Sequence, residues 1–515
     1  MSDSVSAFVS SLETGETIAK SIESLLHGDP EAIRPLSVEG ELIHQLGNTK
    51  AACLVSKLVL GEDAILDVAS IQSLVELSWT KTCWLSPICV LRPRTAKQVA
   101  QILKISTFSR ITFAIRSGGH SPNPGWASAK DALLIDLGNL NQNSVSPDRG
   151  TASVGPGSKW NDVIAYLDPF NVTVLAGRHP NVGVGGLILG GGVSHFTPEY
   201  GLVSDTLKNV DVVLADGTIV NANAQQNADL FWALKGGGSN FGIATRFDLQ
   251  TIPIRNIWFE SNLYAPGQAH ALLEAFAKYQ EIEDPKASII LSLTPNYGTV
   301  GLVYSAPVER PSVFASFYSI PVMQAAIPGT VGTVLQLNNV IASLASPIPQ
   351  RQVAQHDYRG ASSKVDAQLY KSVYDFWVAK AREVGEKTGS NATFVLQHIP
   401  KSAVDIGYAS GGNALGLPRE TQQWWTSIMD WDDQAHDDLV RSIGIETTAK
   451  WKELSEKSGL DNSFIYMNDA SRDQNPLGSY PPEIIARLKA IARKYDPQGI
   501  FQNLQNGGFL LKDVL

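Results

Sequence analysis

The densest glycine segment of this 515-residue chain spans residues 177–192 and reads GRHPNVGVGGLILGGG. Seven of these residues are glycine, so we expect neither a stable helix nor an ordinary strand here. The interleaved valine, leucine and isoleucine residues also distinguish the segment from a flexible linker, which is rich in serine and glycine. The pattern predicts backbone that passes close to a flat, extended ligand.

Two further glycine clusters flank this segment in the sequence. The first, RSGGHS at residues 116–121, follows the apolar run 111–115, which predicts a buried strand. Its adjacent glycines permit positive φ and let backbone N–H groups approach an anion, and Arg116 could pair with a phosphate. Taken alone, this turn is equally well explained as a strand end with a surface histidine, His120. The other cluster, residues 235–243, follows a short helix predicted at 229–234, and none of the three is a P-loop or a good Rossmann fingerprint.

In this order, the three glycine segments resemble the PCMH-type FAD-binding domain of the vanillyl-alcohol-oxidase superfamily, and most closely its fungal berberine-bridge-enzyme-like branch. The resemblance covers residues 50–255 and resumes at FIYMND (464–469) and at YDPQGIFQNLQNGGFLL (495–511). It implies an α+β, two-domain fold in which an antiparallel-sheet substrate domain is backed by helices.

The same resemblance divides the chain into four segments. They are a helical lead-in packed on the FAD domain (1–80), the PCMH-type FAD-binding domain (81–255), the substrate-binding domain (256–463) and a C-terminal return to the FAD domain (464–515). Within the substrate domain, residue patterning predicts strands at 287–293, 299–305 and 393–398 and a helix at 366–384.

By this resemblance His120 bonds covalently to the 8α-methyl carbon of the flavin. The other cofactor-binding residues that it implies are Arg116, Ser117, Gly118, Gly119, Ser121, His179, Val182, Gly183, Gly186, Gly190, Gly191, Gly192, Gly242, Ile243 and Asn503. Many relatives form a second bond from a cysteine in the motif Gly-x-Cys-Pro, whereas this sequence has His179 at the cysteine position. We therefore expect one covalent link, through His120, with His179 facing the flavin or packing beneath it.

Candidate catalytic residues lie in the segment FIYMND. Tyr466 and Asn468 match the family's Tyr-x-Asn pattern, and Asp469 follows where several relatives have a tyrosine base. A carboxyl group near the apolar flavin face would have a raised pKa, so Asp469 is a candidate base beside Tyr466; alternatively, Asp469 is a structural hydrogen-bond acceptor. Further candidates, for the pocket walls, are Tyr304, Gln397, His398 and Trp424, of which 397 and 398 alternate in direction, so only one of these two faces the flavin.

The reaction implied by the resemblance is oxidation of a small organic substrate, such as a secondary-metabolite intermediate. Hydride passes to flavin N5, and molecular oxygen reoxidises the flavin to give hydrogen peroxide. Two alternatives stay open: a flavin-containing cyclase, such as a Diels–Alderase, with no net redox change, and a flavoprotein scaffold without catalysis. The sequence predicts no metal site and leaves substrate identity and oligomeric state undetermined.

Composition excludes several other classes of partner. The net charge is −9 without a basic stripe, which disfavours nucleic acid and anionic membranes, and no apolar run reaches the ~18 residues of a membrane span. The first residues lack a basic n-region and an apolar core, so we expect an intracellular, cytoplasmic protein. Some secreted relatives carry a disulfide near the domain entry, where Cys53 and Cys89 would be the natural pair; an intracellular protein would keep both, and Cys83, reduced.

Overall fold

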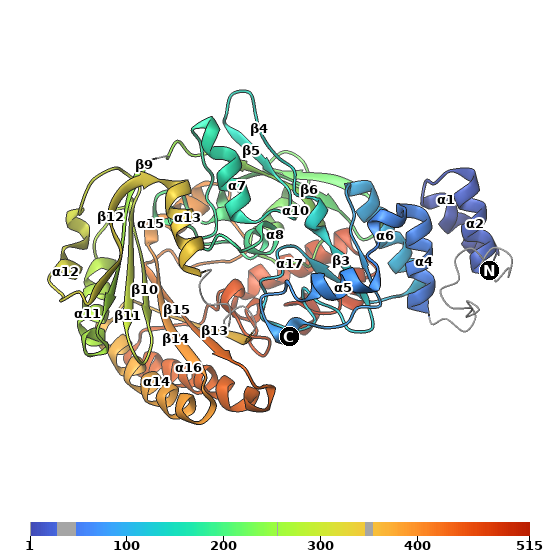
Figure 1. Cartoon of the computed structure of the whole chain (residues 1–515). Helices are drawn as coiled ribbons and strands as arrows, with labels where there is room; N and C mark the ends of the chain where they lie inside the picture. Colours follow the sequence, from blue (N-terminus) through green and yellow to red (C-terminus); the bar gives the residue numbers. More distant parts are fainter. Residues whose placement is uncertain (1, 28–47, 255, 346–353, 515) are drawn as a thin grey trace.

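The computed structural model describes residues 2–27, 48–254, 256–345 and 354–514 (Figure 1). Helices and sheets are segregated as the predicted α+β class requires, and the class is confirmed. In the described residues, a three-stranded and a five-stranded sheet belong to the part that carries the glycine segments, and an eight-stranded sheet forms the second part. None of the described helices is long and apolar enough to cross a bilayer.

The described residues of the first part begin with helices. They are α1 (Ser2–Ser11), α2 (Glu16–His27), α4 (Asn48–Leu60) and α5 (Val68–Val75). Apolar residues of α1, α2 and α4 share a core with α6 (Ala96–Ser109), which begins at the N-cap Thr95. This lead-in therefore packs directly on the first sheet rather than standing apart from it.

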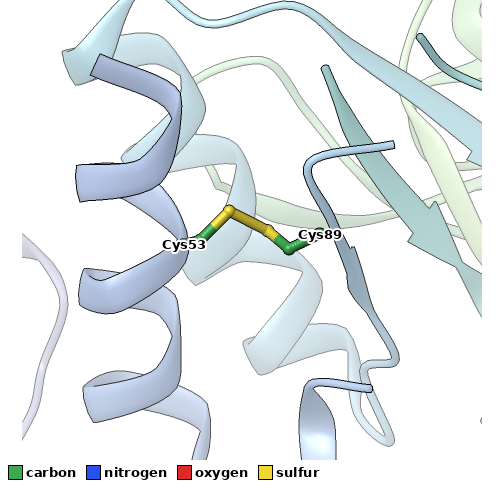
Figure 2. Close-up of a disulfide and its surroundings, with 2 residues drawn as sticks. All are labelled: Cys53 and Cys89. Atoms are coloured by element: carbon green, nitrogen blue, oxygen red, sulfur yellow. A yellow bond between two sulfur atoms is a disulfide. The ribbon is translucent and has the colours of Figure 1, made fainter. Parts of the chain in front are cut away.

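A disulfide fastens the lead-in to the sheet. Cys53 of α4 is bonded to Cys89 of β1, with Cα atoms 6.3 Å apart (Figure 2). The pairing implied by the family resemblance is therefore present, and Cys83 is the free, buried cysteine.

Parallel strands form the first small sheet, in the order β1 (Cys89–Leu91), β3 (Leu133–Asp136) and β2 (Phe113–Arg116). The antiparallel five-stranded sheet has the order β4 (Asn143–Val145), β5 (Thr151–Val154), β8 (Ile243–Gln250), β6 (Leu207–Val213) and β7 (Ile219–Asn223). The first glycine cluster begins at the end of β2 and the third runs into β8, so both sheets direct glycine turns towards the same region.

The dense glycine segment contains a short helix, α8 (Val184–Leu189), which corrects the expectation that it holds none. Gly183 is its N-cap, and Ser117 Oγ accepts a hydrogen bond from the Gly185 N–H at 3.1 Å. The buried side chains of Val184 and Ile188 anchor the helix in the core, which offsets the low helix propensity of glycine.

The eight-stranded antiparallel sheet begins at Asn256. Its order is β12 (Gln324–Thr333), β9 (Asn256–Tyr264), β11 (Gly298–Tyr304), β10 (Ala287–Leu293), β14 (Asn391–Ile399), β15 (Gln422–Trp431), β13 (Gln355–Ser363) and β16 (Asp461–Asn462). The strands predicted at 287–293, 299–305 and 393–398 correspond to β10, β11 and β14 and are confirmed.

Three helices cover the outer face of this sheet, namely α11 (Ala269–Gln280), α14 (Ala367–Thr388) and α16 (Asp437–Ser458) (Figure 1). The helix predicted at 366–384 is α14, which begins at the N-cap Asp366. Because side chains alternate along each strand, one set packs under these helices and the other faces the glycine segments. The remaining α-helices are α7 (Trp160–Leu167), α9 (Thr197–Tyr200), α10 (Ala228–Leu234), α12 (Ala315–Tyr318), α13 (Val334–Ala345), α15 (Lys401–Ala409), α17 (Pro482–Tyr495) and α18 (Ile500–Asn503).

Candidate active site

A cavity of about 690 Å³ lies between the glycine segments and the inner face of the eight-stranded sheet. One wall consists mainly of backbone from residues 117–121, 182–190 and 238–244. The opposite wall consists of side chains from β9, β10, β11, β14 and β15. Residues 466–470 and 505–509 close the cavity from the C-terminal part of the chain.

Two of the glycine segments touch each other through their backbones. A Cβ atom at Gly118 would lie 2.5 Å from the Gly183 Cα, so neither glycine can be replaced without moving backbone. Gly119 has φ +68°, a left-handed conformation that glycine adopts at little cost. The predicted residues Ser117, Gly118, Gly119, Ser121, Val182 and Gly183 all line the cavity.

Arg116 does not face the cavity, which corrects its predicted role as a phosphate partner. Its guanidinium is buried, lies 3.6 Å from a carboxylate oxygen of Asp136 and donates a hydrogen bond to the Leu74 carbonyl at 2.7 Å. A Cβ atom at Gly119 would lie 2.9 Å from the Arg116 Nε, so the side chain packs beneath the turn. Arg116 therefore supports the glycine turn from the protein side.

His120 lines the cavity and stacks on Trp79, with ring centroids 4.6 Å apart. The other face of Trp79 stacks on His356 at 4.1 Å, and the Nδ1 of His356 lies 2.7 Å from a carboxylate oxygen of Asp430. Burial, followed by the neighbouring His179, lowers the pKa of His120 to about 3. The imidazole is therefore neutral at physiological pH and keeps a nitrogen lone pair for bond formation.

His179 also lines the cavity, and its ring centroid is 5.7 Å from that of His120. Its Nδ1 accepts a hydrogen bond from the Asn181 N–H at 3.3 Å, and burial lowers its pKa. His179 was expected either to face the flavin or to pack beneath it. In the structure its side chain lies at the cavity wall. Its imidazole offers no thiol for a thioether.

The predicted glycines at the end of α8 divide into two groups. Gly186 and Gly190 line the cavity, and a Cβ atom at Gly186 would meet no protein atom within 4 Å. Gly191 and Gly192 lie behind the wall, because a Cβ atom at either would contact leucine or valine side chains of the core. The predicted contacts of Gly191 and Gly192 with the cofactor are therefore corrected. These glycines have φ values of +106° and +81°, which the turn after α8 requires.

Gly242 and Ile243, both predicted to bind the cofactor, line the cavity at the start of β8. Asn503 does not: it is exposed at the end of α18, so its predicted role over the cofactor is wrong. From the same C-terminal signature, Gln505, Gly507 and Phe509 reach the cavity instead. A short helix and the turn after it decide which of these neighbouring residues faces inward.

A hydrogen-bonded cluster surrounds Asp469. A carboxylate oxygen of Asp469 accepts hydrogen bonds from Gln397 Nε2 at 2.5 Å and from Thr426 Oγ1 at 2.8 Å. Burial raises the pKa of Asp469, although these two donors and the charge of Arg178 oppose the shift. The carboxyl group can therefore exchange a proton closer to neutral pH than an ordinary aspartate does.

Tyr466 lines the cavity beside this cluster. Its hydroxyl accepts hydrogen bonds from the Gly192 N–H at 3.1 Å and from Asn468 Nδ2 at 2.9 Å. Burial, together with the charge of Asp469, raises the pKa of Tyr466, so the phenol stays protonated near neutral pH. Tyr466 is therefore suited to donate a hydrogen bond, and the raised pKa makes it a poor general base.

Of the predicted pocket walls, only Gln397 faces the cavity. His398 points to the opposite side of β14, where its Nδ1 lies 3.3 Å from Gln280 Nε2. Tyr304 packs towards Phe314 under the helices, and Trp424 is buried behind Tyr466, on which it stacks at 4.6 Å. Strand alternation therefore holds for residues 397 and 398, and the three aromatic predictions at 304, 398 and 424 are corrected.

Arg178 and His195 are among the cavity residues that reasoning from the sequence did not select. Arg178 donates a hydrogen bond from Nη2 to Gln397 Oε1, which links the dense glycine segment to β14 across the cavity. His195 follows the glycine triplet, and both of its ring nitrogens are buried without a hydrogen-bond partner among the described residues. A polar side chain next to a ligand-binding glycine run was the available signal, but its direction depends on the tertiary structure.

The cavity fits an FAD molecule. The glycine segments bring many residues without side chains to one wall, and the space above Gly186 is open. His120 presents a neutral imidazole to the same space. Among the residues that the structure describes, no cluster of histidine, cysteine and acidic side chains has the form of a metal site.

Comparisons with known proteins agree with this geometry. The family model of an FAD binding domain matches residues 87–223. An FAD-dependent monooxygenase of Arthrobotrys oligospora is 36% identical over 471 residues, which cover 90% of each chain. The bifunctional solanapyrone synthase of Alternaria solani is 31% identical over 492 residues, which cover 94% of this chain and 93% of that protein.

The fold also has solved counterparts. The glucooligosaccharide oxidase of Acremonium strictum, which carries a 6-S-cysteinyl, 8α-N1-histidyl FAD, matches with a TM-score of 0.68 at 18% identity. The match covers 82% of this chain and 92% of the oxidase. This likeness concerns the fold.

Proposed function

We propose a specific oxidase activity for this chain, which belongs to the fungal berberine-bridge-enzyme-like FAD-linked oxidoreductases of the vanillyl-alcohol-oxidase superfamily. The chain is an FAD-linked oxidoreductase. We propose further that the protein oxidises a small organic molecule, such as a secondary-metabolite intermediate. Molecular oxygen is the final electron acceptor and is reduced to hydrogen peroxide.

The observation that carries the proposal is the position of His120. Its neutral imidazole lies in the cavity wall that the glycine segments form, next to the space that FAD fits. We propose that His120 holds the flavin by one covalent bond, because His179 replaces the cysteine that would form a second. When bound, FAD would supply two-electron redox chemistry between the substrate and oxygen.

The side chains around Asp469 supply the proton chemistry. Asp469, with its raised pKa, takes the proton from a substrate hydroxyl group, and Gln397 and Thr426 orient its carboxylate. The protonated Tyr466 donates a hydrogen bond to a substrate oxygen. We therefore propose Asp469, rather than Tyr466, as the base.

The test compares His120→Ala with His179→Ala. We expect wild-type protein and His179→Ala to retain flavin after acid precipitation, and His120→Ala to lose it, as measured by absorbance of the washed pellet and by peptide mass spectrometry. Peroxide release with a panel of polyketide, terpenoid and alkaloid intermediates then tests the oxidase activity. Acid-stable flavin in His120→Ala would disprove the attachment.

A second candidate function is cyclisation without net redox change. A relative that is 31% identical over most of both chains is named a bifunctional synthase, so a protein of this kind is described as having more than one activity. Anaerobic turnover of substrate without bleaching of the flavin absorbance would favour this cyclase, whereas bleaching by substrate would favour the oxidase.

We propose that the substrate and oxygen are small-molecule partners and that neither nucleic acid nor a membrane is bound. The compartment remains a prediction. The Cys53–Cys89 disulfide favours an oxidising compartment over the intracellular one expected from the sequence, because reducing compartments keep such pairs as thiols.

A further inference from the structure

Arg178 brings a partly buried positive charge to the cavity wall. Within the described part of the chain its side chain hydrogen-bonds to the neutral amide oxygen of Gln397; the charge of Asp469 acts on it but forms no direct ion pair with it. Burial lowers the pKa of Arg178, which reflects the cost of holding a guanidinium ion away from water. Buried charges are normally paired, so this geometry leaves a place for an anion.

His195 contributes hydrogen-bonding capacity to the same cavity. Both ring nitrogens are buried, and within the described part of the chain neither has a partner. Burial, and secondly the charge of Arg178, lower the pKa of His195 to about 3, so the ring is neutral. A neutral imidazole offers one donor and one acceptor, and both remain available to a ligand.

The sheet side of the cavity combines aliphatic with polar side chains. Ile290, Val303, Val395 and Ile428 face it from four neighbouring strands, and further aliphatic side chains from β12 and α13 adjoin them. The sheet strands also contribute the aromatic residues Phe259 and Tyr358 and polar side chains that include Glu260, Ser292, Thr299, Gln397 and Thr426. The four aliphatic side chains on adjacent strands suit the hydrocarbon portion of a ligand that also carries a polar group.

We propose that Arg178 and His195 bind an anionic oxygen of an amphiphilic substrate, an enol, phenol or carboxylic acid, whose aliphatic portion lies against β10, β11, β14 and β15. This inference rests on the proposed function, because it assigns the substrate class of the same cavity. Arg178 is then a substrate-binding residue, and its hydrogen bond to Gln397 orients the guanidinium.

The arrangement also conserves charge during proton transfer from an enol or phenol. Gln397 joins Arg178 to Asp469, since it accepts from the guanidinium and donates to the carboxylate. When the substrate O–H bond breaks, its proton goes to Asp469 and its electron pair stays on the substrate oxygen. The negative charge thus moves from Asp469 to an oxygen that Arg178 can pair with, and the net charge of the cavity is unchanged.

The experiment measures the binding of decanoate and of decanamide to the purified flavin-loaded protein by isothermal titration calorimetry. The two probes share an aliphatic tail and differ in charge, so we expect decanoate to bind at least tenfold more tightly. Arg178→Met should reduce this preference to about twofold or less, whereas Arg419→Met, which removes an exposed arginine that pairs with Asp405, should preserve it. Thermal unfolding and flavin absorbance verify that each variant is folded and loaded.

Several results would overturn the inference. The first is equal binding of decanoate and decanamide by the wild-type protein. The second is an unchanged preference for decanoate in Arg178→Met. The third is an Arg178→Met variant whose flavin has a changed affinity for sulfite while its preference for decanoate is intact. The last would mean that the arginine serves the flavin. If Arg178→Met does not fold, His195→Leu replaces it and should weaken decanoate binding at least threefold, with unchanged binding overturning the proposal. A preference for decanoate without peroxide formation from any substrate would support the anion site and contradict the oxidase function.

Discussion

The indole ring of Trp79 lies flat against the imidazole ring of His120, with 11° between the ring planes. The backbone N–H of Trp79 also donates a hydrogen bond to the Gly119 carbonyl at 3.0 Å. Trp79 therefore contacts both the glycine turn and the imidazole ring of His120. His356 supports Trp79 from the other face. Trp79 is therefore a positioning residue for His120: it limits the orientation of the ring that faces the cavity.

We expect Trp79→Leu to lower the covalently bound fraction of flavin about fivefold. An aromatic pair contributes about 1 kcal/mol beyond its area, and without it the His120 ring samples other orientations. The measurement is acid-stable flavin per protein as a function of time after FAD is added to apoprotein. Trp84→Leu is the matched control, since the Trp84 indole bonds to the Ser78 carbonyl and does not stack on His120. Equal flavin incorporation in both variants would contradict the positioning role.

Asp469→Asn should lower kcat about 10²- to 10⁴-fold, because it removes the base that accepts the substrate proton. The wild-type kcat/KM should rise with pH through the raised pKa of Asp469, since the base acts in its deprotonated form. Thr426→Val removes a hydrogen bond that lowers this pKa, so it should move the acid limb of the profile to higher pH. An acid limb that stays in place in Thr426→Val would show that another group titrates.

Gly186→Ala should block the cofactor without damaging the fold. The added methyl group meets no protein atom within 4 Å but projects into the cavity that we assign to FAD. We expect normal thermal unfolding of the apoprotein and a reduced flavin content. Gly267→Ala, which also meets no protein atom and lies outside the cavity, should bind flavin normally. Full flavin loading of Gly186→Ala would argue against this placement of the cofactor.

Gly118→Ala should behave differently from Gly186→Ala, because its methyl group would lie 2.5 Å from the backbone of Gly183. The two glycine segments would have to separate, so both thermal stability and flavin content should fall. Differential scanning fluorimetry of the apoprotein distinguishes the two variants. An unchanged melting temperature in Gly118→Ala would contradict the close backbone approach.

Removal of the disulfide with a Cys53→Ser and Cys89→Ser double variant should lower the free energy of unfolding by about 3–4 kcal/mol. The reason is the sequence separation of 36 residues, which the cross-link closes into a loop in the unfolded chain. Urea denaturation with and without a reducing agent gives the difference. A reductant should destabilise only the wild-type protein, and denatured wild-type protein should react as a single thiol, Cys83. Three reactive thiols would contradict the pairing.

The sequence alone was sufficient for features that local patterning controls. The apolar run before His120 is a strand that ends in a glycine turn, and residues 287–293 and 366–384 form the predicted strand and helix. In each case a run of similar residues, or a cap such as Asp366, decides the local conformation. The order of the three glycine segments also indicated the fold, through its resemblance to the PCMH-type FAD-binding domain.

The direction of single side chains depended on contacts between distant segments. Arg116 and Arg178 each stand beside a glycine run, yet Asp136 binds the first beneath the turn and Gln397 holds the second in the cavity. Asn503 faces away from the cavity because α18 ends at that residue. Local sequence was thus enough to specify the strand, the glycine turn and the histidine that it carries. Which charged side chains reach the cavity depends on the packing of distant segments, because the energy of a buried charge depends on partners far away in the chain.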